Sequence, residues 1–208
     1  MTAAQNHLLY LSLLAKMRPG DIICCQGDPG DVVGGIIQRV SKSLITHEMT
    51  VRQATHQGKD AIATQCTMLG GEPNGAQSEP IEGILTSQYP TGRAWLLTLA
   101  APIRARIDWF KFYEAIGAAE DRVKYDWVGL VLYALHLRAN PNPKAMFCDE
   151  YCIWLMQQCG ALAPESEGGL NPREQTPQAL ANLTLFDGCF QIWGTPMNIP
   201  WGKYSEVS

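Results

Sequence analysis

The stretch Ile-Thr-His-Glu-Met-Thr-Val-Arg-Gln, residues 45–53, decides the fold because its side chains alternate along the chain. The residues at odd positions, from His47 to Val51, share one side, and those at even positions, from Glu48 to Arg52, share the other. This period of two predicts a half-buried β-strand with His47 pointing into the domain. A turn follows, and residues 60–67 form a second predicted strand, so the pair is expected to make an antiparallel hairpin.

Further elements extend outward from this hairpin in both directions. We expect strands at residues 21–26, 93–99 and 189–193, helices at residues 1–16, 32–43, 107–120, 127–138 and 146–159, and a helical turn at residues 178–182. Residues 68–92 are rich in glycine, proline and polar turn formers, which predicts a loop insertion anchored by Ile81, Ile84 and Leu85. The interleaved order predicts one α+β domain over residues 1–208, with a small antiparallel sheet packed against helices.

The composition limits the functional classes. The chain has 208 residues, of which 46% are hydrophobic and 17% are charged, so it can bury a core and is not intrinsically disordered. Its net charge of -4 and its lack of long Lys or Arg runs argue against binding nucleic acid or a membrane surface through a basic patch. No apolar run approaches the roughly 18 residues of an integral membrane segment. The N-terminal stretch lacks the basic start and cleavage site of a signal peptide, so we expect cytoplasmic synthesis.

Seven cysteines stand at positions 24, 25, 66, 148, 152, 159 and 189. Their odd number and the absence of a CxxC pair argue against a disulfide framework and favour free, mostly buried thiols in a reducing compartment. An alternative is a zinc site that combines Cys148 and Cys152 with His47. Structural zinc sites usually have tighter spacing that contains CxxC, so we expect no metal.

Cys148 is the first candidate for chemistry because it begins a predicted helix directly after a Pro-rich loop. The start of a helix offers unpaired N–H groups and a positive partial charge, which favour a thiolate and can stabilise an oxyanion. Cys152 and Cys159 follow on the same helix stripe and fit a core. A second interpretation is therefore that Cys148 is only the first residue of this buried stripe and has no chemical role.

His47 and Gln65 are the candidate partners, one from each strand of the hairpin. A histidine can act as general base for a cysteine, and a polar group on the adjacent strand can orient its ring. Both also fit an ordinary core, as a hydrogen-bonded histidine and a strand amide. His56, beside the turn, is a weaker alternative for either role.

Four segments stand in an order that matches a known family: Met17-Arg-Pro-Gly-Asp-Ile-Ile23; Leu44-Ile-Thr-His47; Tyr125-Asp-Trp127 with Phe147-Cys-Asp-Glu150; and Thr176-Pro177 with Leu185-Phe186. In this order they resemble the "pGDii" strand, the histidine strand, the "YDW … FCSE" stretch and the late "P…L…LF" segment of the circularly permuted NlpC-type papain-fold hydrolases. That group includes the YiiX-like proteins and, more distantly, the lecithin:retinol acyltransferase-like enzymes. The resemblance covers roughly Met17 to Trp193.

The resemblance implies a permuted papain-like fold in which the histidine precedes the cysteine. It implies Cys148 as nucleophile, His47 as general base and Gln65 as third residue, where the family more often has Glu. Tyr125 would line the substrate cleft, unless it is a plain core aromatic, and no cofactor is expected. The implied reaction is hydrolysis of an amide or peptide bond, with cell-wall peptides as one substrate class.

Two other functions stay open. One is an acyltransferase or lipid hydrolase of the same fold. The other is a catalytically inactive papain-like module that binds a partner, which departures from the family pattern at Glu48, Gln65 and Asp149 would support. A cell-wall substrate would require export, for example by a phage lysis system or a specialised secretion system.

Overall fold

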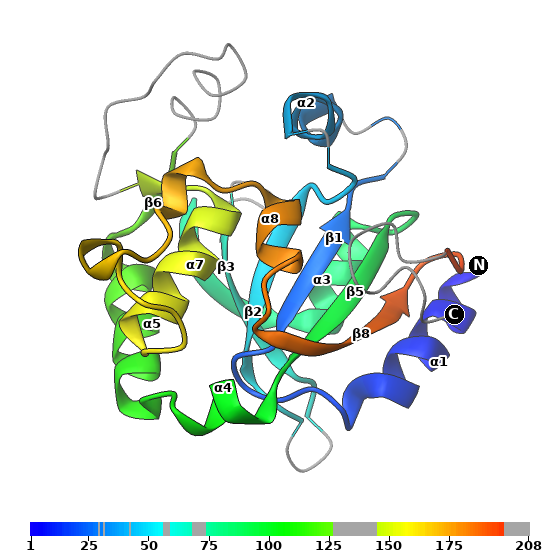
Figure 1. The fold of residues 1–208 in the computed structure, drawn as a ribbon. Coiled ribbons are helices and arrows are strands. Elements are labelled where there is room, and N and C mark those ends of the chain that lie inside the picture. The colour runs from blue at the N-terminus through cyan, green and yellow to red at the C-terminus, as the bar shows by residue number, and fades with distance from the viewer. Residues whose placement is uncertain are drawn as a thin grey trace.

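The fold is a six-stranded antiparallel sheet with helices on both faces (Figure 1). The computed structural model describes residues 1–28, 30, 32–41, 43–55, 59–67, 74–126 and 145–197. The strand order is β4-β3-β2-β1-β5-β8. The strands are β1 (Ile22–Gln26), β2 (His47–Gln53), β3 (Ile62–Thr67), β4 (Gly75–Pro80), β5 (Arg93–Leu99) and β8 (Phe186–Trp193). A separate parallel pair joins β6 (Lys124–Tyr125) to β7 (Ala145–Met146). The expected α+β class and antiparallel sheet are confirmed.

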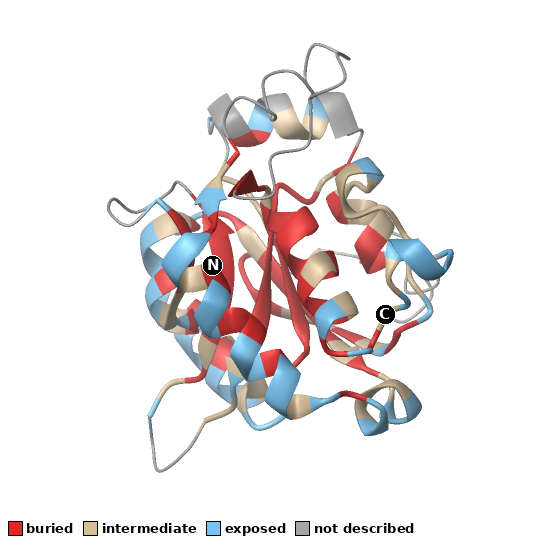
Figure 2. Cartoon of the chain, turned by 90° about the vertical axis from the view of Figure 1, so that its left-hand side faces the viewer, coloured by how far each residue is buried: buried red, intermediate tan, exposed pale blue. Residues whose placement is uncertain are grey.

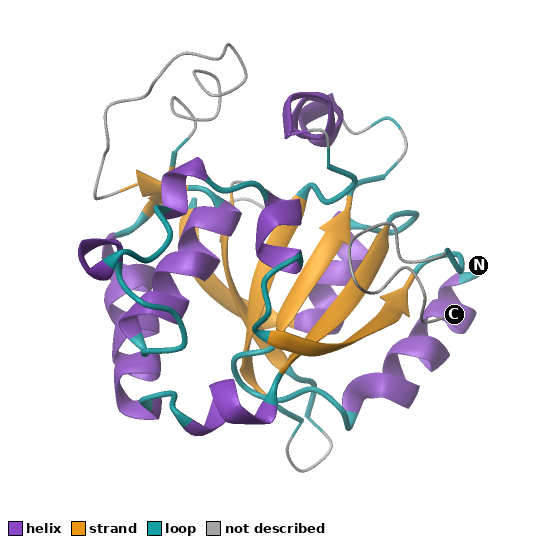
Figure 3. Cartoon of the chain, in the orientation of Figure 1, coloured by secondary structure: helices purple, strands orange, loops and turns teal. Residues whose placement is uncertain are grey.

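The helices cover the two faces of the sheet unequally (Figure 3). They are α1 (Ala3–Leu14), α2 (Val32–Ser41), α3 (Ile81–Gln88), α4 (Ala101–Ala105), α5 (Trp109–Arg122), α7 (Cys148–Gln158) and α8 (Pro177–Ala181), with short 3-10 turns η1 (Glu165–Glu167) and η2 (Pro172–Glu174). One core cluster joins the even-numbered side chains of β1 to α5, α7 and α8, and we call this side the α7 face. A second cluster joins the odd-numbered side chains of β1 and β2 to α1 and α3, and we call this side the α3 face. The central strands β1, β2, β3 and β5 are mostly buried between the two clusters, whereas the outer strands β4 and β8 are partly exposed (Figure 2).

A turn at Gly20 and Asp21 fixes the start of the sheet. Gly20 has φ +88°, and its N–H donates to the Val51 carbonyl at 2.8 Å. Asp21 is buried, and its carboxylate accepts a hydrogen bond from the Leu99 N–H at 2.9 Å and pairs with Arg104. The aspartate of the Met17–Ile23 segment therefore links β1 to its neighbours on both sides.

The structure corrects two sequence expectations. β2 is not half-buried, because Glu48 and Thr50 are fully buried on the α7 face as well. The loop insertion expected at 68–92 contains β4 and α3 in its described part, since Ile81 and Leu85 are buried against the α3 face instead of anchoring a loop. The polar composition of the segment reflects a strand near the edge of the sheet and a short helix.

Several other expectations are confirmed or lie outside the described residues. The N-terminal helix begins at Ala3 after a capping box, in which Thr2 and Gln5 each accept the other's backbone N–H. Helix α7 ends before Gly160, which has φ +79°, and α4 was not anticipated. The helix expected at 127–138 and the residue His56 lie outside the described residues. Among the helices of the described residues, none has the length and apolar character that crossing a bilayer requires.

Candidate active site

β2 and β3 separate at one end, and the candidate residues gather there. Their paired residues run from Thr50 with Thr64 to Gln53 with Ile62. In contrast, β2 pairs with β1 from His47 onward, and β3 pairs with β4 up to Thr67. In the described register, residues 47–49 of β2 and residues 65–67 of β3 are therefore not paired with each other. We call this place the β2–β3 split.

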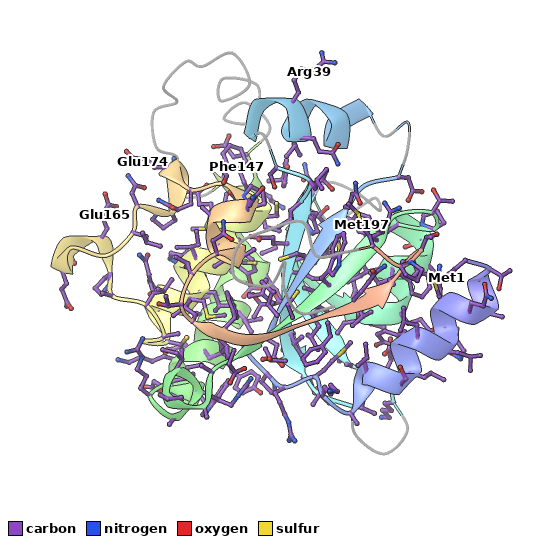
Figure 4. The ribbon with its side chains drawn as sticks, turned by 45° about the vertical axis from the view of Figure 1, so that its right-hand side comes forward. Met1, Arg39, Phe147, Glu165, Glu174 and Met197 are labelled. Carbon is purple, nitrogen blue, oxygen red and sulfur yellow. The ribbon has the colours of Figure 1, made fainter. Side chains whose placement is uncertain are left out.

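Helix α7 begins at the split and carries Cys148 as its first residue. The helix runs along β2 on the α7 face, where the Thr50 hydroxyl lies 3.4 Å from the sulfur of Cys152. Just before the helix, the thiol of Cys66 at the end of β3 donates to the Met146 carbonyl at 3.2 Å. Phe147 lies toward the same end of the molecule as α2 (Figure 4).

The sulfur of Cys148 reaches the backbone of β2 inside the split. The Glu48 N–H hydrogen-bonds to it. The Val51 N–H donates to the Asp21 carbonyl next to β1 at 2.7 Å, and backbone N–H groups alternate in direction along a strand. The N–H of Glu48 therefore points toward β3, into the space that the missing pairing leaves open.

Burial raises the pKa of the Cys148 thiol well above its ordinary value, and the carboxyl groups of Asp149 and Glu48 raise it further. The hydrogen bond from the Glu48 N–H acts in the opposite direction. The expectation that the start of the helix would favour a thiolate is therefore wrong for the resting site. One reason is that the Asp149 carboxyl accepts hydrogen bonds from its own N–H and that of Glu150, which places negative charge at the positive end of the helix.

His47 is held on the α3 face by a partner on the next strand. Its Nε2 atom lies 2.7 Å from Oε1 of Gln65, and both residues are buried. The ring also stacks on Tyr89, with centroids 6.3 Å apart and planes inclined by 23°. The expected pairing of His47 with Gln65 is thus present. Burial lowers the pKa of His47 to about 4, against a smaller opposing effect of the Gln65 hydrogen bond, so the ring is neutral at pH 7.

Cys148 and His47 approach the split from opposite faces of the sheet. The imidazole lies on the side of Met49, and the thiol lies on the side of the α7 core. In the described structure the sulfur and the ring make no hydrogen bond, and Nδ1 of His47 has no hydrogen-bond partner among the described residues. The structure therefore brings the thiol to the backbone beside His47 but does not pair the two side chains.

Tyr125 lies close to the thiol. It is in β6, its ring packs edge-on against Phe147 with centroids 6.4 Å apart, and it is partly exposed. Burial raises its pKa, and the nearby Cys148 and Asp149 raise it further. A position beside Cys148 agrees with a role in lining the site.

Three carboxyl groups around the site were not assigned roles from the sequence. Glu48 is buried beside Cys24, whose thiol lies 3.5 Å from Oε1, and Oε2 has no hydrogen-bond partner among the described residues. Asp149 caps the helix start, and Glu79 accepts a hydrogen bond from Nε2 of Gln65 at 3.3 Å. Glu48 was expected on the exposed side of a half-buried strand, and Glu79 in a loop. No local signal marked Glu48 as buried, because its chain neighbours His47 and Met49 and the next residue on its face, Thr50, all fit a half-buried strand.

The other cysteines do not form a metal site in the described structure. All seven cysteines are free and buried, as expected. Within the described ranges, no group of three or more His, Cys, Asp or Glu side chains has the arrangement to hold a metal ion.

Comparison of the chain with protein-family models gives no match, and comparison with curated proteins gives no significant match.

Proposed function

We propose that the chain is a cysteine hydrolase with a permuted papain-like fold that cleaves amide or peptide bonds. The observation that carries the proposal is the arrangement at the split. A histidine whose Nε2 is held by Gln65 stands one residue from the backbone N–H that contacts the helix-start thiol of Cys148. A thiol, an imidazole and a group that orients the imidazole are the parts that nucleophilic catalysis by cysteine requires.

The reaction begins from a neutral thiol and a neutral imidazole. Nδ1 of His47 takes the thiol proton as Cys148 attacks the substrate carbonyl, and Gln65 keeps the ring in place. The N–H of Cys148, at the start of α7, is the donor assigned to the oxyanion, because the Asp149 carboxyl occupies the next two N–H groups. The imidazolium then protonates the leaving amine, and water, activated by the same imidazole, releases the acyl group from the sulfur.

This mechanism requires the sulfur and Nδ1 to approach each other when substrate binds. Hydrogen bonds of a catalytic site are often long or poorly aligned without substrate and tighten in the complex. The start of α7 would have to move toward the split for the sulfur to reach the ring, from a position in which the thiol accepts the Glu48 N–H.

A second candidate function is an inactive papain-like module that binds a partner. The specific observation in its favour is the raised pKa of Cys148, which burial and two adjacent carboxyl groups cause. Under this alternative, the hydrogen bond between His47 and Gln65 is only part of the buried core.

The test compares wild type with Cys148→Ala and, as a matched control, Cys189→Ala, which removes another buried thiol. Substrates are a cell-wall stem tetrapeptide, p-nitrophenyl acetate and phosphatidylcholine vesicles. We expect hydrolysis of the peptide or the ester to fall at least about 10³-fold in Cys148→Ala alone, with both variants folded by circular dichroism. Turnover of the vesicles only would favour the lipid-hydrolase alternative, and no Cys148-dependent turnover of any substrate would favour the binding module.

A further inference from the structure

We propose that Glu79 is a positioning residue that sets the tautomer of His47, an inference that rests on the proposed function. Glu79 acts through Gln65. Its carboxylate decides which end of the Gln65 amide faces the imidazole, and this decides which ring nitrogen carries the proton.

Three adjacent strands place these side chains in a row on the α3 face. His47 is in β2, Gln65 in β3 and Glu79 in β4. The register pairs Ala63 with Glu79 and Gln65 with Gln77, so Glu79 is a diagonal neighbour of Gln65 on the same face. Oε1 of Gln65 lies 2.7 Å from Nε2 of His47, and Nε2 of Gln65 lies 3.3 Å from Oε2 of Glu79.

The chemistry of the row allows only one orientation of the amide. A carboxylate accepts hydrogen bonds and cannot donate them, so the NH₂ group of Gln65 must face Glu79. The carbonyl oxygen of Gln65 then faces His47, and Nε2 of His47 must carry the hydrogen. A neutral imidazole has a single N–H, so the lone pair is on Nδ1, the nitrogen that must accept the thiol proton.

Without the carboxylate, the amide could turn over. Its NH₂ would then donate to Nε2, the hydrogen would move to Nδ1, and the ring could no longer accept a proton from Cys148. The Glu79 carboxylate thus acts on the imidazole through Gln65, which contacts both side chains.

The test uses Glu79→Lys, which replaces an acceptor by a donor, and Glu79→Gln, which can still accept through its carbonyl oxygen. Glu79 is partly exposed, so the fold should tolerate either side chain. Glu114→Lys is the control, because it makes the same charge change at an exposed position on α5. The readout is the ring ¹⁵N–¹H correlation spectrum of ¹⁵N-histidine-labelled protein at pH 7, together with turnover of p-nitrophenyl acetate.

We expect the Nε2–H form of His47 in wild type, Glu79→Gln and Glu114→Lys, and the Nδ1–H form in Glu79→Lys with at least about a tenfold loss of turnover. If Glu79→Lys does not fold, Glu79→Ala is expected to give ring shifts averaged between the two forms. An unchanged Nε2–H form of His47 in both Glu79→Lys and Glu79→Ala would overturn the proposal. A change of tautomer in a protein that never shows Cys148-dependent turnover would contradict the proposed hydrolase while leaving the positioning role intact.

Discussion

The two faces of β2 differ in how their buried polar side chains are hydrogen-bonded. On the α3 face, His47 has a hydrogen-bond partner in Gln65, which has its own partner in Glu79. On the α7 face, Glu48 is fully buried with one carboxyl oxygen unpaired among the described residues, and it lies close to the Cys148 thiol. One face is an ordered chain of donors and acceptors, and the other is a cluster of acids in an apolar core.

This difference determines the resting state of the site. Burial lowers the pKa of His47 to about 4 and raises that of Cys148, so both partners are neutral at pH 7. The α3 face supplies a base with a fixed orientation, whereas the α7 face keeps the thiol protonated. The proton must then move during the attack on substrate.

Removing the imidazole of His47 should have the largest effect on turnover. We predict that His47→Ala lowers turnover of the ester or peptide by about 10²–10⁴-fold, the usual contribution of general acid–base catalysis. His7→Ala, at an exposed position on α1, is the control and should leave turnover unchanged. Wild-type turnover in His47→Ala would mean that the imidazole is only part of the core.

The lowered pKa of His47 predicts that kcat/KM falls only at more acidic pH than for an ordinary histidine base. An ordinary histidine base with pKa 6.5 would lose about tenfold in kcat/KM between neutral pH and pH 5.5. Because the pKa of His47 is about 4, the ring stays neutral at pH 5.5 and most of the activity should remain. A pH–rate profile with its acid midpoint near 6.5 would contradict the buried, neutral base.

Removing an acid from the α7 face should make the thiol more reactive. The Asp149 carboxyl raises the pKa of Cys148, so Asp149→Asn should lower that pKa and increase the rate of Cys148 alkylation by iodoacetamide at pH 8. A change of one pKa unit corresponds to about a tenfold gain in thiolate, which is the upper limit we expect. Glu174→Gln, on an exposed part of η2, serves as the control. An unchanged rate in Asp149→Asn would contradict a contribution of the Asp149 carboxyl to the raised pKa of the thiol.

The smallest effect concerns stability against pH. Burial raises the pKa of Asp149 and Glu150 to about 7 each. Groups with a raised pKa in the folded state stabilise it fully below the unfolded value near 4, and this contribution is lost as pH rises through 7. His47 acts in the opposite sense, because its stabilising contribution is lost as pH falls from 6.5 through 4. We therefore predict a Tm that falls by several degrees between pH 5.5 and pH 8.5, and a smaller fall in Asp149→Asn.

Local patterns were enough to predict much of the fold. The alternation of residues 45–53, the turn at Gly20 and the stripe of α7 predicted β2, β1 and the last long helix in their observed places. The failures came from tertiary contacts. Packing of α7 on β2 buries Glu48, and a strand paired beside β3 formed from residues 75–80, whose polar composition favours a loop.

The candidate site was predicted in part for the same reason. The contact of Gln65 with His47 follows from their places on adjacent strands, so the sequence could anticipate it. The protonation of Cys148 depends on burial and on carboxyl groups that come from a strand and a helix far apart in the chain. No local pattern contains that information.

A substrate-like electrophile tests most directly the proposal that Cys148 and His47 act together. Wild type and His47→Ala would be treated with a peptidyl vinyl sulfone at pH 7, and intact-protein and peptide mass spectrometry would locate the adduct among the seven cysteines. We predict a single adduct on Cys148 in wild type, formed at least about tenfold more slowly in His47→Ala. Adducts spread over several cysteines, or an equal rate on Cys148 in both proteins, would contradict it.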